Sequence, residues 1–283
     1  MTKKGRKRLK ILGFWRMDNV QLKKQEEKTM RTLKKVLALT VVLATLLSIS
    51  AFAAFSDEES IDESFVDAVN LLGALNVMTG DTEGTFRPND TISRAEAAKM
   101  IYVIRNGGVD DQAAGWTGMS TFSDVPSGAW FEGYVNYCAS LGIIAGRGNG
   151  KFDPAATVTG NEAAKMLLVA AGYDAQLEGL TGADWAIKTA SLASTLGIFD
   201  DLTAPTGDPL TRDNAALLIY NALDIEMIQK YENGYALAFK DSRTILSAMY
   251  GVYKVEGVVV GNKWAELGKT DSDSALKDGK TVL

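Results

Sequence analysis

Two arginines stand out as the side chains that could bind a ligand. Arg94 lies in TISRAEAAKM, residues 91–100, and Arg212 lies in TRDNAALL, residues 211–218. Each is expected at the first position of a helix, where a cation opposes the helix dipole. A residue placed against its local preference invites a functional explanation, and a guanidinium beside the free amides of a helix start suits a carboxylate. The alternative is a surface arginine paired with a nearby acidic side chain.

The stretch around the first arginine belongs to a unit that the chain repeats. TVTGNEAAKM, residues 157–166, repeats residues 91–100 at a spacing of 66, with Gly160 in place of the arginine. A third, weaker copy follows at a spacing of 55, so that Trp130 corresponds to Trp185. Units that repeat in this way cannot bury their apolar faces alone. We therefore expect the three copies to share one core.

Each copy predicts a helix, a loop and a second helix, and hence a mainly α fold. Apolar residues recur at helical spacing over residues 65–75 in the first copy and over residues 131–141 in the second. Cys138 falls within this stripe, so we expect a buried small hydrophobe. The loop GDTEGTFRPND, residues 80–90, has the glycine, proline and asparagine content of a tight turn.

Hydroxyl and carboxyl side chains mark the start of each second helix. Ser93 and Glu96 have the spacing of a capping box, and so have Thr159 and Glu162. In such a box the hydroxyl accepts from the third amide of the helix, and the carboxylate accepts from the amide of the capping residue. Thr211 is expected to keep the cap in the third copy. The recurrence of the motif is therefore partly structural.

The composition excludes several kinds of chemistry. The chain contains no histidine and a single cysteine, so histidine catalysis, Cys/His metal sites and an intrachain disulfide are ruled out. No nucleophile elbow or phosphate-binding loop occurs. We therefore expect a protein that is not an enzyme, with no catalytic residues, no metal and no cofactor. The net charge is −5, and the chain after residue 53 is strongly acidic, which makes nucleic acid a poor partner.

The basic beginning of the chain is typical of a secretion signal. Residues 30–53 contain a basic stretch, an apolar run of 14 residues and the small-residue motif AFA. They predict a signal peptide that is cleaved before Ala54, with an uncleaved anchor as the alternative. No other stretch is long enough to span a bilayer, so we expect an exported protein. Residues 1–29 fit no structural role and are interpreted as a mis-annotated extension before a true start at Met30, with a long basic n-region as the alternative.

These repeats resemble the S-layer homology (SLH) family. Its pattern runs F-x-D-V, an aromatic residue, G-I-x-x-G, a G-x-F-x-P loop and T-R-A-E at the start of a helix. FSDVPSGAWFEGYVNYCASLGIIAGRGNGKFDP, residues 122–154, follows it most closely. The resemblance covers residues 55–223 and places the repeats at 54–111, 121–174 and 178–223. It implies three helix-loop-helix repeats in a pseudo-threefold bundle with projecting prong helices.

The repeat pattern stops after the third copy. Residues 241–251 predict a short helix, and residues 252–260 are rich in β-branched side chains and predict a strand. We therefore expect a short C-terminal α/β segment. Residues 235–283 are interpreted as the start of a β-rich module that is truncated, because a chain rarely ends within an unpaired strand.

The resemblance implies non-catalytic attachment to the cell surface, or S-layer, of a bacterium. Family members bind an anionic secondary cell-wall polysaccharide that is attached to peptidoglycan and often bears pyruvyl ketals; other S-layer subunits are further partners. Arg94 and Arg212 would bind the carboxylate, while Gly80 and Gly146 would permit a close approach of the backbone. The other candidates are Trp130 and Trp185, as groove walls or packing residues, and Asp57 and Asp124, which would orient their neighbours.

The copies depart from the family pattern in places. Gly160 replaces the arginine in copy two, and copy three lacks the F-x-D motif, so at most two grooves are expected to be complete. Two other functions stay open. One is a hydrolase fragment that acts on wall polysaccharide through a pair of carboxylates. The other is a spacer of degenerate repeats that binds no ligand.

Overall fold

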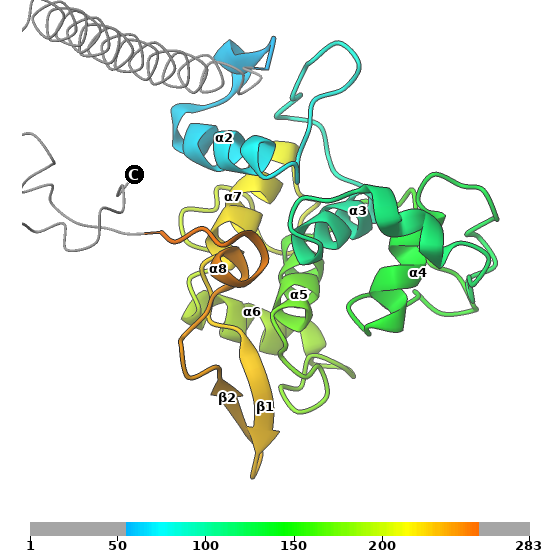
Figure 1. Cartoon of the computed structure of the whole chain (residues 1–283), viewed down its shortest axis with the longest axis vertical. Coiled ribbons are helices and arrows are strands. Elements are labelled where there is room, and N and C mark those ends of the chain that lie inside the picture. Colours follow the sequence, from blue (N-terminus) through cyan, green and yellow to red (C-terminus); the bar gives the residue numbers. More distant parts are fainter. Residues whose placement is uncertain (1–54, 255–283) are drawn as a thin grey trace, which may run out of the picture. The chain divides into compact units, whose positions relative to one another are not determined.

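The computed structural model describes residues 55–254, which are mainly helical with one two-stranded sheet (Figure 1). The expected N-terminal extension, the signal peptide and the last part of the expected β-rich module lie outside the described residues. In chain order, the elements are η1 (Glu58–Ser60), η2 (Glu63–Phe65), α2 (Val66–Ala74), α3 (Arg94–Arg105), η3 (Asp111–Trp116), α4 (Glu132–Ser140), α5 (Gly160–Ala170), α6 (Trp185–Thr195), α7 (Arg212–Ala222), β1 (Ile228–Glu232), β2 (Tyr235–Ala238) and α8 (Ile245–Tyr250).

The helices from α2 to α7 alternate between two roles. α2, α4 and α6 are the first helices of the expected helix-loop-helix segments, and α3, α5 and α7 are the second helices. Each first helix packs against the second helix of another segment: α4 contacts α3, α6 contacts α5, and α2 contacts α7 (Figure 1). The apolar stripe of one segment is therefore buried by a neighbouring segment, as expected for units that share a core.

The second helices form the centre of the core. α5 contacts both α3 and α7. Large side chains of these helices are almost fully buried, among them Ile104 of α3, Leu167 and Leu168 of α5, and Leu218 of α7. Cys138 of α4 is also buried, which confirms that it acts as a small hydrophobe. Burial raises the pKa of its thiol to about 12, so the sulfur is unreactive at neutral pH.

Three backbone hydrogen bonds join the segments in a closed ring just before the second helices. The amide of Ile92 donates to the carbonyl of Leu210 (3.1 Å), that of Leu210 to Val158 (2.8 Å), and that of Val158 to Ile92 (3.1 Å). The three residues are at most 2% exposed. A buried amide left without an acceptor costs about 1–3 kcal/mol, so each segment depends on the other two.

The first amides of the second helices are occupied by neighbouring loops. The amide of Arg94 donates to Ala156 (2.8 Å), and that of Ala95 donates to Pro154 (3.0 Å). α7 repeats both bonds, from Arg212 to Asp90 and from Asp213 to Pro88, and α5 has one of them, from Asn161 to Thr206. The expectation of free amides beside the arginines is therefore wrong, because a helix start buried between segments must find its acceptors within the protein.

Two capping boxes start α3 and α5, as predicted. Ser93 Oγ accepts from the amide of Glu96 (3.2 Å), whose carboxylate accepts from the amide of Ser93 (2.7 Å). Thr159 and Glu162 make the same pair of bonds at 3.3 and 3.1 Å. Each box satisfies two backbone donors that the helix itself cannot satisfy.

The prediction that the Thr211 side chain caps α7 is wrong. Thr211 occupies the capping position, but its hydroxyl accepts no helix amide. The carboxylate of Asp213 takes over the role: it accepts from the Thr211 hydroxyl and from the amide of Asn214, the latter at 2.6 Å. An acidic side chain in the first turn is also favoured by the helix dipole.

The segment after α7 covers the carboxyl ends of the central helices. The amide of Ile228 donates to Ala171 at the end of α5 (2.9 Å), and the amide of Leu246 donates to Leu223 at the end of α7 (2.9 Å). At the end of α3, Gly107 has φ +62°, and a Cβ there would lie 2.7 Å from the carbonyl oxygen of Met249. α8 confirms the short helix expected within residues 241–251.

A β-hairpin precedes α8. Its strands β1 and β2 are antiparallel, with Glu232 opposite Tyr235. The expected start of the β-rich module, residue 235, lies within this hairpin, after β1 and at the first residue of β2. Among residues 55–254, no helix has the length and apolar character needed to cross a bilayer.

The closed ring predicts that two segments cannot fold without the third. A fragment of residues 55–175 lacks the carbonyl of Leu210 and the helix α7 that packs on α2. We expect this fragment to show no sharp thermal transition, while residues 55–254 unfold in a single cooperative step. Circular dichroism melting of both fragments tests this, and a sharp transition in the shorter one would contradict it.

Candidate ligand-binding site

Arg94 reaches from α3 into the loop that precedes α5. Its side chain is only 4% exposed. Nε donates to the carbonyl of Phe152 and Nη2 to that of Ala145, both at 2.8 Å. The guanidinium lies 4.6 Å from the centre of the Phe152 ring. Arg94 therefore ties one segment to the next through charge-assisted hydrogen bonds.

Arg212 makes the equivalent contacts one segment away. It reaches from α7 into the loop that precedes α3, where Nε donates to the carbonyl of Phe86 (2.6 Å) and Nη2 to that of Thr79 (3.2 Å). Its guanidinium lies 5.0 Å from the centre of the Phe86 ring. Burial lowers the pKa of both Arg94 and Arg212, but an arginine stays charged at neutral pH.

Asp57 and Asp124 hold the loops that receive these arginines. The two carboxylate oxygens of Asp57 accept from the amides of Phe86 (2.6 Å) and Arg87 (2.7 Å). Asp124 accepts from Phe152 and Asp153, both at 2.8 Å. Desolvation raises the pKa of each carboxyl, but the backbone hydrogen bonds outweigh it and the net pKa is lowered. Both aspartates orient their neighbours.

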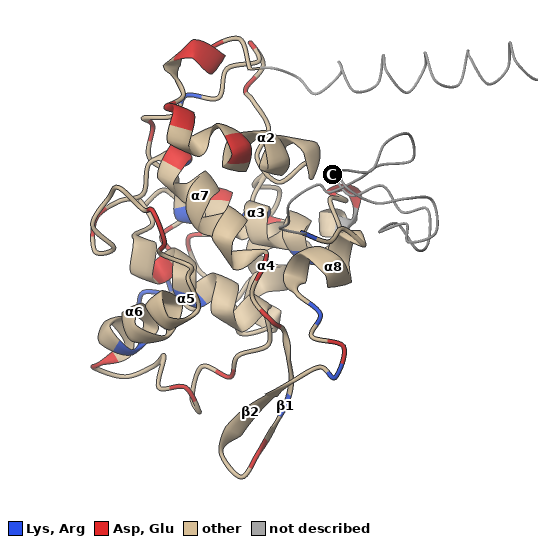
Figure 2. Cartoon of the chain, turned by 90° about the vertical axis from the view of Figure 1, so that its left-hand side faces the viewer, with Lys and Arg blue, Asp and Glu red and all other residues tan. Residues whose placement is uncertain are grey.

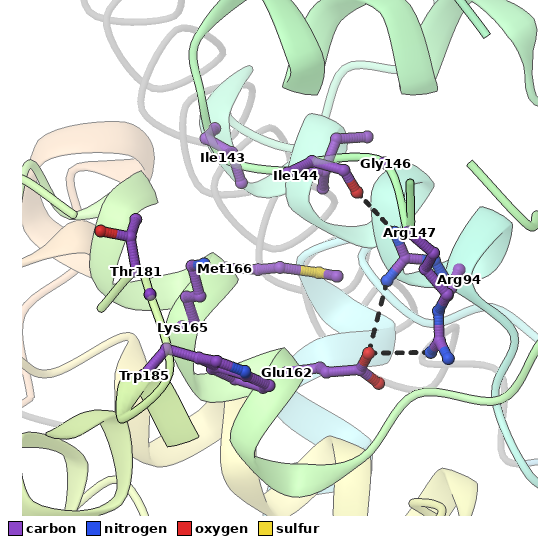
Figure 3. Close-up of a pocket in the computed structure, with 12 residues that line it drawn as sticks. Arg94, Ile143, Ile144, Gly146, Arg147, Glu162, Lys165, Met166, Thr181 and Trp185 are labelled. Carbon is purple, nitrogen blue, oxygen red and sulfur yellow. Dashed lines mark hydrogen bonds and ion pairs between the residues drawn. The ribbon is translucent and has the colours of Figure 1, made fainter. Parts of the chain in front are cut away.

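A pocket of about 320 Å³ lies beside Arg94, and we call it the Lys165 pocket (Figure 3). It gathers side chains from all three segments: Arg94 comes from α3, Lys165 from α5 and Trp185 from the start of α6. Its lining residues are Arg94, Ile143, Ile144, Ala145, Gly146, Arg147, Glu162, Lys165, Met166, Thr181, Gly182 and Trp185.

A second pocket, of about 230 Å³, lies beside Arg212, and we call it the Lys99 pocket. Lys99 and Met100 of α3 correspond in the repeat to Lys165 and Met166 of α5. The lining residues are Val77, Met78, Thr79, Gly80, Asp81, Arg87, Glu96, Lys99, Met100, Trp130 and Arg212. The two pockets are therefore equivalent by sequence position.

The structure brings six of the eight predicted ligand residues together, three in each pocket. Arg94, Gly146 and Trp185 line the Lys165 pocket, and Arg212, Gly80 and Trp130 line the Lys99 pocket. Asp57 and Asp124 line neither pocket. Trp130 is 58% exposed, so its position fits a groove wall better than a packing residue.

The two loop glycines have a reason that is internal to the protein. A Cβ at Gly146 would lie 2.6 Å from the carbonyl oxygen of Lys151 and 2.9 Å from the ring of Phe122. A Cβ at Gly80 would lie 3.2 Å from the Phe55 ring. The close backbone approach that glycine permits is therefore the closure of the loop itself.

Two lysines are pocket residues that the sequence reasoning missed. Lys165 Nζ lies 5.3 Å from the centre of the Trp185 ring, and burial lowers the pKa of this lysine. Lys99 Nζ forms an ion pair with Asp110 at 3.1 Å. The signal was available, because each lysine sits at the same place of the AEAAKM and NEAAKM motifs.

Glu162 is more than a capping residue. Its Oε1 atom lies 2.8 Å from Nη2 of Arg147 and 3.6 Å from Nη1 of Arg94 (Figure 3), while Oε2 accepts from the amide of Thr159. One carboxylate therefore closes the capping box and holds two arginines at the edge of the Lys165 pocket. While Glu162 keeps these two contacts, the guanidinium groups of both arginines stay at the edge of the pocket.

The start of α5 at Gly160 differs from the starts of α3 and α7, where the two arginines lie. A Cβ at Gly160 would lie 3.0 Å from both Cα and the carbonyl oxygen of Thr206. The third-segment loop is three residues shorter. Its Thr206 accepts from Asn161 as Pro154 accepts from Ala95, so Ala204 stands where the second loop has Phe152. Gly160→Arg therefore cannot simply restore a third groove, because the shortened loop already fills the space.

Arg94→Ala is expected to destabilise the fold, contrary to the expectation from a helix dipole alone. The change leaves two carbonyls without their donors and removes the cation held by Glu162. We expect a loss of about 2–4 kcal/mol in the free energy of unfolding, measured by urea denaturation. Arg243→Ala is the matched control, since this arginine forms an exposed ion pair with Asp241. An equal effect of both changes would contradict the structural role of Arg94.

Asp124→Asn is expected to lower stability by about 1–2 kcal/mol, because an amide side chain offers one acceptor to two backbone donors. The pKa of Asp124 is lowered in the folded state from its ordinary value of 3.8. The stabilisation is therefore present above pH 3.8 and is lost as the pH falls through the folded value. Thermal melting of wild type and variant at several pH values should show their difference shrinking below that pH. A difference that is constant with pH would argue against an ionised Asp124 as the acceptor.

Comparison with known proteins identifies the domain type. Residues 54–98 and 121–164 match the family model described as the S-layer homology domain. The expected third repeat, residues 178–223, is not among the matched residues. The match covers the F-x-D motifs, the loops and the starts of α3 and α5.

Similar proteins include several from bacterial surfaces. A "Cell surface protein" of Thermoanaerobacter kivui is 31% identical over 260 residues, which cover 90% of this chain and 31% of the relative. A "Middle cell wall protein" of Brevibacillus brevis is 28% identical over 236 residues, 83% of this chain and 21% of the relative. "Exoglucanase XynX" of Acetivibrio thermocellus is 28% identical over 173 residues, 56% of this chain and 15% of the relative.

The chain spans less than a third of the length of each of these relatives. The domain match and the surface proteins among the relatives support a secreted, cell-surface location. The chain carries the S-layer homology domain at residues 54–98 and 121–164.

Proposed function

We propose that this protein is a non-catalytic module that anchors itself or an attached domain to an anionic polysaccharide of the bacterial cell wall. The proposal includes a third, diverged repeat over residues 178–223, a pseudo-threefold arrangement of the three repeats, and export through the signal peptide at residues 30–53. The closed ring of Ile92, Val158 and Leu210 supports the arrangement.

The observation that carries the proposal is the recurrence of one set of side chains in two pockets. Each pocket combines a tryptophan, a lysine, a buried arginine and a glutamate, contributed by three different segments. Aromatic faces suit the apolar faces of sugar rings, and lysine and arginine suit carboxylates. A structural requirement alone would not place a 58% exposed tryptophan at the mouth of the Lys99 pocket.

Binding must rely on local contacts. The chain has a net charge of −5, and Figure 2 shows acidic residues on α2, on the hairpin and in several loops. Such a surface does not attract an anionic polymer from a distance. Cations that line a pocket supply the attraction at close range, where less water separates the charges.

A wall-polysaccharide hydrolase is the second candidate, and the relative named as an exoglucanase raises it. The pocket carboxylates do not favour it. Glu162 is held by two arginines and a helix amide, and Glu96 is held by the hydroxyl and amide of Ser93. A glycosidase needs two carboxyl groups that can reach the scissile bond, whereas these two are engaged by contacts within the protein. A spacer without a ligand is the third candidate, and the repeated pockets argue against it.

Trp185→Ala is expected to weaken binding to purified cell walls about tenfold. Stacking that buries roughly 50 Å² of apolar surface contributes about 1.2 kcal/mol. Tyr235→Ala is the control for the loss of an aromatic side chain outside the pockets, since Tyr235 is 74% exposed on the hairpin and lines neither pocket, whereas Trp185 is partly buried. Cosedimentation with cell walls gives the affinity, and thermal melting checks that both variants fold.

The same assay separates the three candidate functions. Walls whose secondary polymer has been chemically removed should no longer retain the wild-type protein. Retention that is unchanged by this treatment contradicts the polysaccharide ligand. Release of soluble sugars from intact walls by the wild type would favour the hydrolase instead.

A further inference from the structure

The two equivalent pockets differ in charge at one loop position. Arg147 in the Lys165 pocket corresponds to Asp81 in the Lys99 pocket. Asp81 is fixed as an anion by its own loop, because the Thr85 hydroxyl and the amides of Thr85 and Glu83 all donate to it. These hydrogen bonds, led by that of the Thr85 hydroxyl, lower the pKa of Asp81 to about 2. The same position therefore carries a cation in one pocket and an anion in the other, where Asp81 lies 3.5 Å from Arg87.

The pocket lysines differ in the same direction. Lys99 is paired with Asp110, with Nζ 3.1 Å from Oδ2. Among residues 55–254, Lys165 takes part in no ion pair, and its ammonium group lies over the face of the Trp185 ring. A partly buried ammonium without a carboxylate partner is a favourable place for an incoming anion, because its burial has already removed part of its water.

The total charge of the linings follows from these differences. In the Lys165 pocket three cations, Arg94, Arg147 and Lys165, face the single carboxylate of Glu162. In the Lys99 pocket three cations face the two carboxylates of Asp81 and Glu96, and Asp110 pairs with one of those cations.

Mutual repulsion of cations occurs in both pockets, since in the Lys99 pocket the positive charge of Arg87 contributes, after burial and Glu96, to the pKa of Arg212 by lowering it. After burial and Glu162, the next influence on the pKa of Arg94 is the positive charge of Arg147, which lowers it. A ligand carboxylate placed between Arg147 and Lys165 would offset this repulsion. Arg147 is 41% exposed, so its guanidinium can meet a ligand without unfolding the loop.

We propose that the Lys165 pocket alone binds the anionic group of the ligand, through Lys165 and Arg147, and that Asp81 and Asp110 keep the Lys99 pocket from doing so. This inference rests on the wall-binding function proposed above. It goes beyond that function because it assigns one carboxylate of the polymer to each chain and gives the second pocket at most a role in contacting neutral sugar.

A matched pair of variants tests the inference. Lys165→Gln and Lys99→Gln remove the same charge from equivalent positions of α5 and α3 while keeping a long polar side chain. In cosedimentation with purified cell walls, we expect Lys165→Gln to weaken binding about tenfold or more and Lys99→Gln by less than about twofold. Thermal melting of both variants controls for folding.

A gain of binding tests the role of Asp110. Asp110→Asn removes the partner of Lys99 without touching the lining of either pocket. Added to Lys165→Gln, it is expected to recover part of the lost affinity, because the freed Lys99 can then meet the carboxylate. No recovery in a folded double variant would remove the assigned role of Asp110.

The outcomes distinguish the two proposals. Equal losses for Lys165→Gln and Lys99→Gln, or a larger loss for Lys99→Gln, overturn the single-pocket inference and leave wall binding intact. A wild-type protein that does not bind intact walls, or that binds walls stripped of their secondary polymer equally well, overturns both.

Discussion

The rest of the structure depends on the way each segment satisfies the helix start of another. Backbone amides at the start of a helix have no acceptor within the helix. Here the first amides of α3 and α7 donate to loop carbonyls of neighbouring segments, and the guanidinium at the same position adds two further donors. Because these groups are buried, none of them can turn to water instead. The segments must therefore come together before any one of them is stable.

The contacts that join neighbouring segments also shape the candidate binding site. Arg94 fixes the loop that carries Gly146 and Arg147, and Asp124 fixes the same loop from its other end. The wall of the Lys165 pocket is thus preorganised by interactions that serve folding first. A ligand that enters meets side chains whose positions have already been set, so little conformational entropy remains to be lost on binding.

Much of the architecture was predictable from repeated local patterns. The capping boxes at Ser93 and Thr159, the apolar stripes and the short helix within residues 241–251 all depend on residues close in sequence, and the structure contains them. The hairpin was missed although Asn233 and Gly234, both with positive φ, carry a strong turn signal. Thr211 failed as a cap because its neighbour Asp213 competes for the same amide, a choice that spacing alone does not reveal.

The site was predictable in its residue types and less so in its geometry. The arginines, tryptophans and loop glycines of the predicted site line the two pockets, because the repeat relates them. The burial of the arginines could not be predicted from the sequence of one repeat, because the carbonyls that accept their hydrogen bonds belong to a loop of another segment. The ion pair of Lys99 with Asp110 depends likewise on tertiary packing. Ion pairs between residues of different segments or loops therefore determine how much positive charge each pocket offers to a ligand.

Gly160 at the start of α5 affects the order in which the three segments can pack together during folding. At two of the three contacts between segments an arginine packs on a phenylalanine, and at the third Gly160 packs on Thr206 of the shortened loop. The arginine ends of α3 and α7 do not fit the shortened loop, and Gly160 would leave an arginine-sized hole in either of the longer loops. The segments can therefore close in only one order. During folding, such unlike joints disfavour misordered closure within a chain and exchange of segments between chains, a hazard of proteins built from similar repeats.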